Sequence, residues 1–354
     1  MADGYVAYVS SYTYGNKNPL GISIYDVDVA AGRMEKKDQV EITNSSYLSI
    51  SHNRKYLYSI TDFGVESYKI DQKTGELKML NTASINGMRG THLSTDYDDK
   101  FLFVAGYHDA KLTVLKLKKD GSVGEITDEI YHKGLGSIAE RNYQPHLSCV
   151  RMTRDNKFLL AVNLGMDHVI VYELNHTSGK LRQIDIIRSE QNSGPRHIKI
   201  SKDGRFVYIV HEVKNYIDVY RYQVDKNDVP EFEKIQTIPT VNDYHASNSA
   251  ACTINISEDY KYIVSSNAGD NSAVLYSVNE KTGILTKLLC LPVSGDYPKD
   301  VCLFPDSKHL VSLNHESNTM TFFTVNPKAG TIVMNGPELH VDRPNCIIFY
   351  KLNP

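Results

Sequence analysis

Two short stretches carry the side chains best suited to catalysis, and they flank one predicted hairpin. The first is Gly194-Pro195-Arg196-His197, and the second is His211-Glu212. Between them, a turn at Lys202-Asp203-Gly204 joins two apolar runs with strand character. The residue before the first strand of a hairpin and the residue after the second lie at the same end. The spacing therefore predicts that Arg196 and Glu212 share one edge of a sheet.

These residue types suit acid–base chemistry on a small anionic or carbonyl-containing molecule. An arginine presents a planar fork that fits a carboxylate, a phosphate or a developing oxyanion. A histidine or a glutamate can take a proton from water or from a substrate carbon, which typically contributes about 10²–10⁴-fold to a rate. His146, which follows Pro145 as Arg196 follows Pro195, is the third candidate.

The elements that position these residues recur along the chain. A strand, a turn, a second strand, a loop, a third strand, a tight Gly-containing turn and a fourth strand repeat with a period of about 50 residues. Six such units are complete, and they begin near Tyr47, His92, His146, Arg196, Ala251 and Lys299. Four strands per unit at this period predict an all-β fold, a β-propeller.

The two ends of the chain predict how the propeller closes. Residues 5–40 supply the last three strands of a unit, and residues 345–349 supply a lone first strand. Together they complete a seventh blade, which pairs the two ends and removes an open edge. The prediction is a single domain over residues 1–354: a seven-bladed β-propeller with four antiparallel strands per blade, its ring closed by the N-terminal strands and the C-terminal strand.

Equivalent positions of a propeller converge around its central channel, so polar residues at strand ends are predicted to gather at one channel mouth. The first strands begin with Tyr47, Thr91-His92, His146, Arg196, Lys299 and Asn345, and the second strands end with Asp62, Tyr107-His108, Asn163, His211-Glu212, Asn267 and Asn314-His315. Many of these side chains also suit a wet channel mouth or a loop cap without any function.

Composition excludes several classes of function. The chain has 354 residues and a formal net charge of −3, which gives no electrostatic footprint for nucleic acid or an anionic membrane. Its five cysteines form no CxxC pair and no metal-ligand spacing, so they are interpreted as reduced and structural. No run of about 18 apolar residues occurs, and the N-terminus does not read as a signal peptide. A cytoplasmic protein is expected.

The same residues resemble the lactonase family of seven-bladed propellers, which includes propeller-type 6-phosphogluconolactonases and fungal 3-carboxy-cis,cis-muconate lactonising enzymes. The resemblance covers essentially the whole chain. It is carried by Gly194-Pro195-Arg196-His197 with His211-Glu212, by Arg141 with Gln144-Pro145-His146, by Leu164-Gly165-Met166-Asp167, by Ser266-Asn267 and by Pro298-Lys299-Asp300.

The resemblance implies a lactone hydrolase that acts on a small sugar-acid lactone, with no cofactor. It implies that His146, Arg196 and Glu212 are the catalytic residues; which of His146 and Glu212 is the base stays open. The residues expected to bind the substrate are His92, Arg141, His211, Asn267, Lys299, Asn314 and His315.

The chain departs from the family pattern where a phosphate would be held. Ala268 stands where relatives commonly carry an arginine, and Lys299 replaces another arginine, which keeps the charge but loses the bidentate fork. Ser148 stands where many members have a histidine, and Asn163 where many have aspartate. These departures leave open whether 6-phosphogluconolactone itself is the substrate.

Three other functions fit the sequence. The same trio could catalyse cycloisomerisation of an unsaturated carboxylic acid, or the propeller could be a ligand-binding scaffold without catalysis. A metal at the mouth is the third alternative, because five histidines are predicted to approach it: His92, His108, His146, His211 and His315. No metal is expected, since equivalent positions cluster around a ring without one. The sequence leaves the oligomeric state open.

Overall fold

A computed structural model describes residues 4–136, 143–242 and 249–353. The described residues form β-strands and one 3₁₀ helix, arranged in seven sheets. The chain divides into two compact units, one of Met1–Val27, Met34–Asn192 and Asn345–Pro354, the other of Asp28–Arg33 and Ser193–Pro344.

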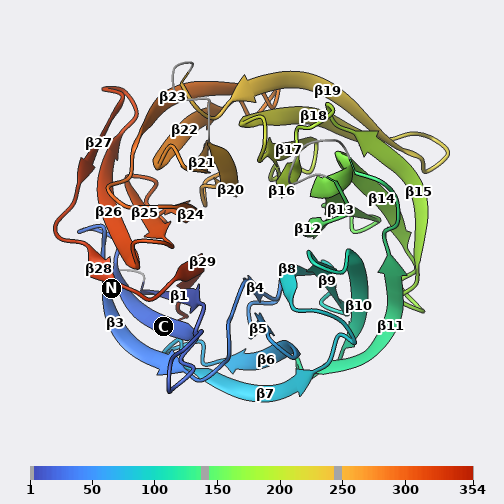
Figure 1. Ribbon diagram of the computed structural model, residues 1–354, viewed down its shortest axis with the longest axis horizontal. Coiled ribbons are helices and arrows are strands. Elements are labelled where there is room, and N and C mark those ends of the chain that lie inside the picture. The colour runs from blue at the N-terminus through green and yellow to red at the C-terminus, as the bar shows by residue number, and fades with distance from the viewer. Residues whose placement is uncertain (1–3, 137–142, 243–248, 354) are drawn as a thin grey trace. The chain divides into compact units, whose positions relative to one another are not determined.

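The first unit contains four sheets, whose strands Figure 1 labels. The first sheet has the order β29 (Pro344–Lys351), β1 (Tyr5–Ser11), β2 (Ile22–Asp28) and β3 (Arg33–Val40). The second contains β4 (Leu48–Ile50), β5 (Tyr56–Thr61), β6 (Gly64–Ile70) and β7 (Leu77–Ala83). The third contains β8 (Gly90–Thr95), β9 (Phe101–Gly106), β10 (Lys111–Leu117) and β11 (Val123–Tyr131). The fourth contains β12 (Leu147–Met152), β13 (Phe158–Asn163), β14 (His168–Leu174) and β15 (Leu181–Arg188), with the 3₁₀ helix η1 (Leu164–Met166) after β13.

The second unit contains the other three sheets. The first of them contains β16 (Pro195–Ile200), β17 (Phe206–His211), β18 (Tyr216–Val224) and β19 (Pro230–Pro239). The next contains β20 (Ala250–Ile256), β21 (Tyr262–Ala268), β22 (Ser272–Val278) and β23 (Leu285–Pro292). The last contains β24 (Pro298–Leu303), β25 (His309–Asn314), β26 (Thr319–Asn326), β27 (Thr331–Met334) and the short β28 (Leu339–His340), which also pairs with β26.

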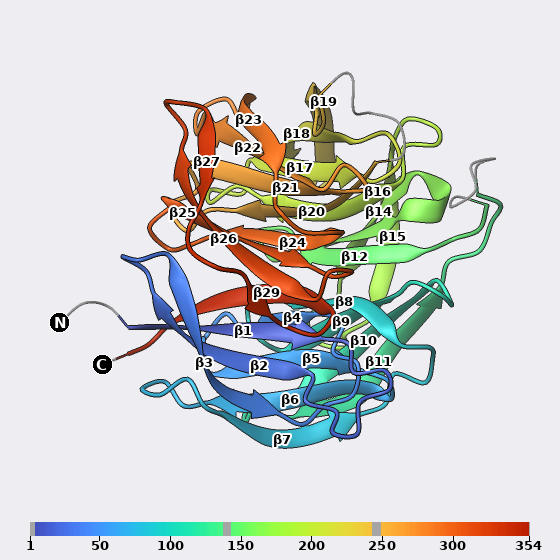
Figure 2. The ribbon, with the colours of Figure 1, turned by 60° about the vertical axis from the view of Figure 1, so that its left-hand side comes forward.

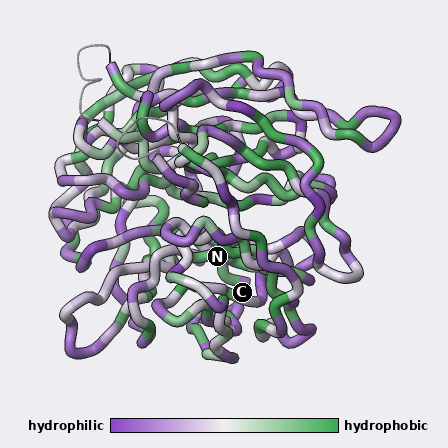
Figure 3. The backbone as a smooth tube through the Cα atoms, turned by 45° about the vertical axis from the view of Figure 1, so that its right-hand side comes forward, coloured by the Kyte–Doolittle hydropathy of each residue, from purple (hydrophilic) through white to green (hydrophobic). Residues whose placement is uncertain are grey.

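Most successive strands of a sheet pair as antiparallel neighbours, as the repeat predicts; β28, which pairs with β26, is an exception. The register of β17 with β18, for example, runs from Phe206 opposite Arg221 to His211 opposite Tyr216. All six residues of β17 are buried, whereas in the outer strand β19 Pro230 is buried and the other nine residues are half-buried or exposed. Hydrophobic residues accordingly follow the strands and hydrophilic residues many of the turns (Figure 3).

The two ends of the chain share one sheet, which confirms the predicted composite blade. β29 lies next to β1 (Figure 2). The amide of Leu352 donates to the carbonyl oxygen of Gly4 at 2.8 Å, and the hydroxyl of Tyr350 donates to the carbonyl oxygen of Arg54 at 2.8 Å. The Arg54 guanidinium also lies 4.8 Å from the centre of the Tyr350 ring. Tyr350 therefore fastens the C-terminal strand to the turn between β4 and β5.

Hydrophobic clusters join neighbouring sheets within a unit. One cluster combines Phe103 and Val114 of the third sheet with Leu147, Val150 and Leu159 of the fourth. The tight turn between β22 and β23 packs on the preceding sheet and needs glycine at one point. Gly283 has a φ of +74°, and a β carbon there would collide with the ring of Phe206.

All five cysteines are free, as predicted. Among the described residues, no helix is long and apolar enough to cross a membrane.

Substitution of Tyr350 tests how β29 is held. Because Tyr350 is 1 % exposed, Tyr350→Ala is expected to lower the free energy of unfolding by about 3 kcal/mol. Tyr350→Phe removes only a hydrogen bond and is expected to cost about 1 kcal/mol. Urea unfolding measures both, with Phe63→Ala as the control because Phe63 is 76 % exposed. Equal costs for the two Tyr350 variants would contradict the role assigned to the buried ring.

Candidate functional site

Arg196 lies at a β-bulge at the start of β16. Pro195 is opposite His211 and His197 is opposite Val210, so Arg196 is the extra residue between them. A bulge bends the strand and changes the direction of a side chain, and bulges are frequent beside active sites. The same irregularity occurs at the start of four other first strands, where it involves Thr91, Ser148, Cys252 and Lys299.

Glu212 follows β17 directly, and its carboxylate forms an ion pair and hydrogen bond with the guanidinium of Arg196. Arg196 and Glu212 thus meet at one edge of one sheet, where the hairpin spacing places them. The backbone of Glu212 is fixed on both sides: its amide donates to the carbonyl oxygen of Gly194 at 2.7 Å, and its carbonyl oxygen accepts from the amide of Ala251 at 3.2 Å.

The pair combines a nearly buried carboxylate with a partly accessible guanidinium. The side chain of Glu212 is 5 % exposed and that of Arg196 is 20 % exposed. Burial alone would lower the pKa of Arg196, but the adjacent Glu212, with Cys252 and Tyr297, raises that pKa above its usual value. The guanidinium is therefore permanently charged and offers its accessible part to an anion or a developing oxyanion.

Lys299 is a second cation that, like Arg196, acts on the thiol of Cys252. Burial raises the pKa of the Cys252 thiol, while the positive charges of Arg196 and Lys299 act in the opposite direction. Cys252 is thus a neutral thiol near both cations, and Lys299 is half-buried. Arg196 and Lys299 are thus two cations that act on this thiol.

His146 precedes β12 in the first unit and is 6 % exposed. Its Nδ1 lies 2.8 Å from the carbonyl oxygen of Tyr107, and its ring stacks on the Tyr107 ring with centroids 4.2 Å apart. A carbonyl oxygen only accepts hydrogen bonds, so Nδ1 carries the proton of the neutral imidazole. Nε2 then holds the lone pair, which is the arrangement that a general base requires.

Asn163 and η1 hold the backbone of His146. The side-chain oxygen of Asn163 accepts from the amides of His146 at 3.1 Å and Met166 at 3.2 Å, while the amide of Leu164 donates to the carbonyl oxygen of His146 at 2.8 Å. A β carbon on Gly165 would collide with the carbonyl oxygen of Gln144. The Leu164-Gly165-Met166-Asp167 stretch therefore positions His146.

His132 supports Asn163 through a hydrogen bond. Its Nδ1 lies 3.1 Å from the amide nitrogen of Asn163, and its Nε2 lies 2.9 Å from the hydroxyl of Tyr172. The Asn163 amide nitrogen is a donor, so Nδ1 accepts and the ring is neutral. Burial lowers the pKa of His132 from 6.5 to about 4, consistent with the neutral form.

Three of the predicted binding residues are fully buried at equivalent strand ends. His211 and Asn314 lie opposite the first residue of β16 and β24, and Asn267 lies opposite Ala251, the second residue of β20; each of the three is 0 % exposed. Asn267 donates to the carbonyl oxygen of Thr240 at 2.8 Å, and Asn314 donates to the hydroxyls of Thr319 and Thr321. This placement favours support of the strand ends, and direct contact with a ligand stays a prediction for all three.

His211 belongs to a buried polar chain that the sequence reading missed. Its Nδ1 lies 3.0 Å from the hydroxyl of Ser193, and its Nε2 lies 3.4 Å from a carboxylate oxygen of Asp218. Burial raises the pKa of Asp218, but His211, Thr237 and Lys234 lower it below its usual 3.8. An acidic residue inside the apolar run of β18 was the available signal. Because Ser193 and Asp218 are 0 % exposed, this chain holds His211, the residue before Glu212, inside the sheet.

The other predicted binding residues differ in accessibility. His92 is 1 % exposed and packs on Tyr47, with ring centroids 4.3 Å apart. His315 is half-buried, with Nδ1 3.2 Å from the carbonyl oxygen of Pro344. Arg141 lies outside the described residues.

The bulges correct one feature of the predicted repeat. The sequence repeat aligns His146 with Arg196 as equivalent strand starts, but Leu147 and Pro195 are the residues opposite Asn163 and His211. Ser148 is therefore the equivalent of Arg196, and His146 precedes it by two positions. A bulge shifts this alignment without disturbing the apolar alternation of the rest of the strand.

The predicted mouth histidines do not form a metal cluster among the described residues. Within residues 4–136, 143–242 and 249–353, one group has three or more potential ligand atoms close together, and none of the five histidines belongs to it.

The chain matches a family description and several relatives. Residues 6–349 match the family described as "Lactonase, 7-bladed beta-propeller". A 6-phosphogluconolactonase of Bacillus subtilis is 29 % identical over 306 residues, which cover 85 % of each protein. The match confirms the predicted all-β, seven-bladed propeller fold class.

Solved structures agree with this fold. A candidate 6-phosphogluconolactonase of Bacteroides fragilis is similar with a TM-score of 0.88 and 28 % identity, over 99 % of this chain and 98 % of that one. The periplasmic gluconolactonase of Pseudomonas aeruginosa has a TM-score of 0.90 and 23 % identity, over 99 % and 100 % of the two chains, and at that identity it supports the fold alone.

The low pKa of His132 predicts a pH-dependent stability. The unfolded chain binds a proton at His132 near pH 6.5 and the native protein only near pH 4, so the stabilisation is complete above pH 6.5 and lost as the pH falls toward 4. At about 1.4 kcal/mol per pH unit, this loss amounts to about 3 kcal/mol.

Urea unfolding at pH 7 and pH 4.5 measures the effect. His132→Gln, which cannot be protonated, is expected to lose less stability between the two values than the wild type does. His340→Gln is the control, since the side chain of His340 is 75 % exposed. The same pH dependence in His132→Gln and the wild type would refute the assignment.

Proposed function

The chain belongs to the lactonase family of seven-bladed β-propellers, and we propose that it is a lactone hydrolase acting on 6-phosphogluconolactone or a related sugar-acid lactone. The observation that carries the proposal is the Arg196–Glu212 pair at the bulged start of β16. Similarity to a 6-phosphogluconolactonase over most of both chains supports the substrate class.

Arg196, Glu212 and His146 divide the hydrolysis between them in this proposal. Arg196 binds the lactone carbonyl and stabilises the oxyanion that forms when water attacks it. Glu212 keeps the guanidinium charged and oriented. Neutral His146 accepts a proton from the attacking water through Nε2 and returns it to the ring oxygen as the lactone C–O bond breaks. One water and one lactone yield one hydroxy acid.

His146 is assigned as the base because of its hydrogen bonding. Tyr107 fixes the tautomer that leaves Nε2 basic, whereas the carboxylate of Glu212 is engaged by Arg196. His146 and Arg196 lie where a first strand begins, and Glu212 lies where a second strand ends. Their joint participation is proposed from this placement and from the family pattern.

The cations near Cys252 suit an anionic lactone. Arg196 and Lys299 both act on the Cys252 thiol. Lys299 is therefore proposed to attract the phosphate or carboxylate of the substrate, as a point charge without a bidentate fork. A single-domain organisation over residues 1–354, a cytoplasmic location and the lack of nucleic-acid and membrane partners stay predictions.

Substitution of the three proposed catalytic residues tests the reaction. His146→Ala, Arg196→Ala and Glu212→Gln are each expected to lower kcat/KM for 6-phosphogluconolactone by roughly 10²-fold or more, since each removes a proton-transfer or charge-stabilising group. Arg196→Lys is expected to lie between Arg196→Ala and the wild type.

Thermal unfolding checks that each variant is folded, and Arg205→Ala, on the exposed turn before β17, is the matched arginine control. Full activity in all three variants would overturn the assignment. A lactone panel without turnover, in which a lactone nevertheless raises the Tm of the wild type, would indicate a binding propeller instead.

Lys299 tests whether the substrate is anionic. Lys299→Met is expected to raise KM for 6-phosphogluconolactone at least about tenfold and to change KM for uncharged gluconolactone little, because only the first loses a charge–charge contact. Lys281→Met, at an exposed turn, serves as control. Equal effects on the two lactones would show that Lys299 does not read the charge.

A further inference from the structure

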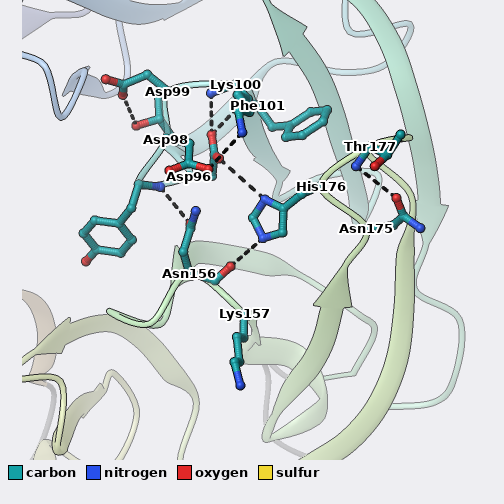
Figure 4. Close-up of polar contacts among 12 residues, drawn as sticks. Asp96, Asp98, Asp99, Lys100, Phe101, Asn156, Lys157, Asn175, His176 and Thr177 are labelled. Carbon is teal, nitrogen blue, oxygen red and sulfur yellow. Dashed lines mark hydrogen bonds and ion pairs between the residues drawn. The ribbon is translucent and has the colours of Figure 1, made fainter. Parts of the chain in front are cut away.

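We propose that Asp96, Asp98 and His176 form a binding site for a divalent transition-metal ion of the zinc class. One potential ligand atom from each residue lies within 4.8 Å of the others (Figure 4). Asp96 and Asp98 belong to the turn between β8 and β9, and His176 to the turn between β14 and β15. All three lie in the first unit.

Asp96 contributes a buried carboxylate oxygen that has no hydrogen-bond partner. The residue is 0 % exposed. Its Oδ1 accepts from the amides of Lys100 and Phe101, both at 2.7 Å. Its Oδ2 accepts no hydrogen bond and lies 4.0 Å from Nδ1 of His176. A buried carboxylate oxygen without a donor is costly, and the site is built around one.

His176 points a lone pair at this oxygen. Its Nε2 lies 2.7 Å from the carbonyl oxygen of Asn156, which only accepts, so Nε2 carries the proton. In the neutral ring, Nδ1 is then an acceptor that faces the Asp96 acceptor. A histidine that donates one ring N–H to a backbone carbonyl and offers the other nitrogen is the usual arrangement of a metal ligand.

The separation of the two acceptors suits an ion better than a shared proton. At 4.0 Å a direct hydrogen bond between Nδ1 and Oδ2 is too long. A zinc ion about 2.0–2.2 Å from each atom bridges that gap. Asp98 supplies a third oxygen, and its exposed contact with Lys100 at 3.0 Å is weak enough for an ion to displace.

Equivalent turns of the chain show what is special about this one. In four of these turns a residue with a hydroxyl occupies the position of Asp96. The hydroxyl accepts a hydrogen bond from the backbone amide five residues later, as Asp96 does; the four residues are Ser51, Thr153, Ser201 and Ser257. In Asp96, Oδ1 accepts this hydrogen bond, and Oδ2 is a second oxygen that the hydroxyl residues lack. Three of these turns have an aspartate at the position of Asp98, and its carboxylate accepts a hydrogen bond from the backbone amide two residues later: Asp155, Asp203 and Asp259. In the β8–β9 turn the corresponding amide, that of Lys100, donates to Asp96. Asp98 is thereby released from the turn.

The donor set selects the class of ion. Two carboxylates and an imidazole favour zinc or a neighbouring divalent transition metal over magnesium or calcium, which prefer oxygen ligands alone. The site lies at the far end of β12 from His146, since Asn156 follows that strand and His146 precedes it. The ion would therefore fasten the β8–β9 turn to the β14–β15 turn and take no part in lactone hydrolysis.

Isothermal titration of the chelator-treated full chain with zinc chloride tests the site. The wild type is expected to bind one equivalent with an accompanying rise in Tm. Asp96→Ser, which restores the residue of three equivalent turns, and His176→Gln are each expected to weaken this binding at least tenfold. Asp203→Asn, at the position of Asp98 in a turn of the second unit, is the matched control and is expected to bind as the wild type does.

The variants also separate this site from adventitious zinc binding. No saturable binding by the wild type, or unchanged binding in both Asp96→Ser and His176→Gln, would overturn the proposal. If Asp96→Ser does not fold, His176→Gln decides alone. Titration with magnesium chloride is expected to give no binding, and tighter binding of magnesium than of zinc would contradict the assigned class.

Discussion

A carboxylate that is almost out of solvent constrains the candidate site. Glu212 can remain charged at 5 % exposure because the Arg196 guanidinium faces it, and removal of either partner would leave an uncompensated buried charge. The bulge at Arg196 makes the contact possible, since the extra residue sits at the end of the strand pair that Glu212 follows. The local backbone irregularity and the electrostatics of the site are thus one feature.

In each unit, buried polar residues fix the strand ends that carry this chemistry. Asn163 holds the backbone of His146, while His211, with Ser193 and Asp218, fills the sheet beneath Glu212. Hydrogen bonds in a low-dielectric interior are electrostatically stronger than in water, and they restrict the movement of these strand ends. Rigid strand ends suit a site that must hold an oxyanion donor and a base in place before substrate arrives.

Much of this arrangement is predictable from sequence, and the failures have physical reasons. The strand repeat predicts the sheets and the joining of the two chain ends, and hairpin geometry brings Arg196 to Glu212. The bulges are invisible because one extra residue leaves the later alternation intact, so His146 is aligned with the wrong position. The full burial of Asn267 and Asn314 also goes beyond what the sequence predicts, because polar residues at strand ends are usually exposed. Asp96 and His176 come from turns about 80 residues apart, and only packing of neighbouring blades relates such turns.

The central claim is that Arg196, Glu212 and His146 act on one sugar-acid ligand. A crystal structure of the full chain with 6-phosphogluconate, the hydrolysis product, tests it most directly. The account predicts that the product carboxylate contacts the Arg196 guanidinium and that Nε2 of His146 lies within hydrogen-bonding distance of the same molecule. Product bound away from Arg196, or contacts with Arg196 in which His146 takes no part, would contradict the account.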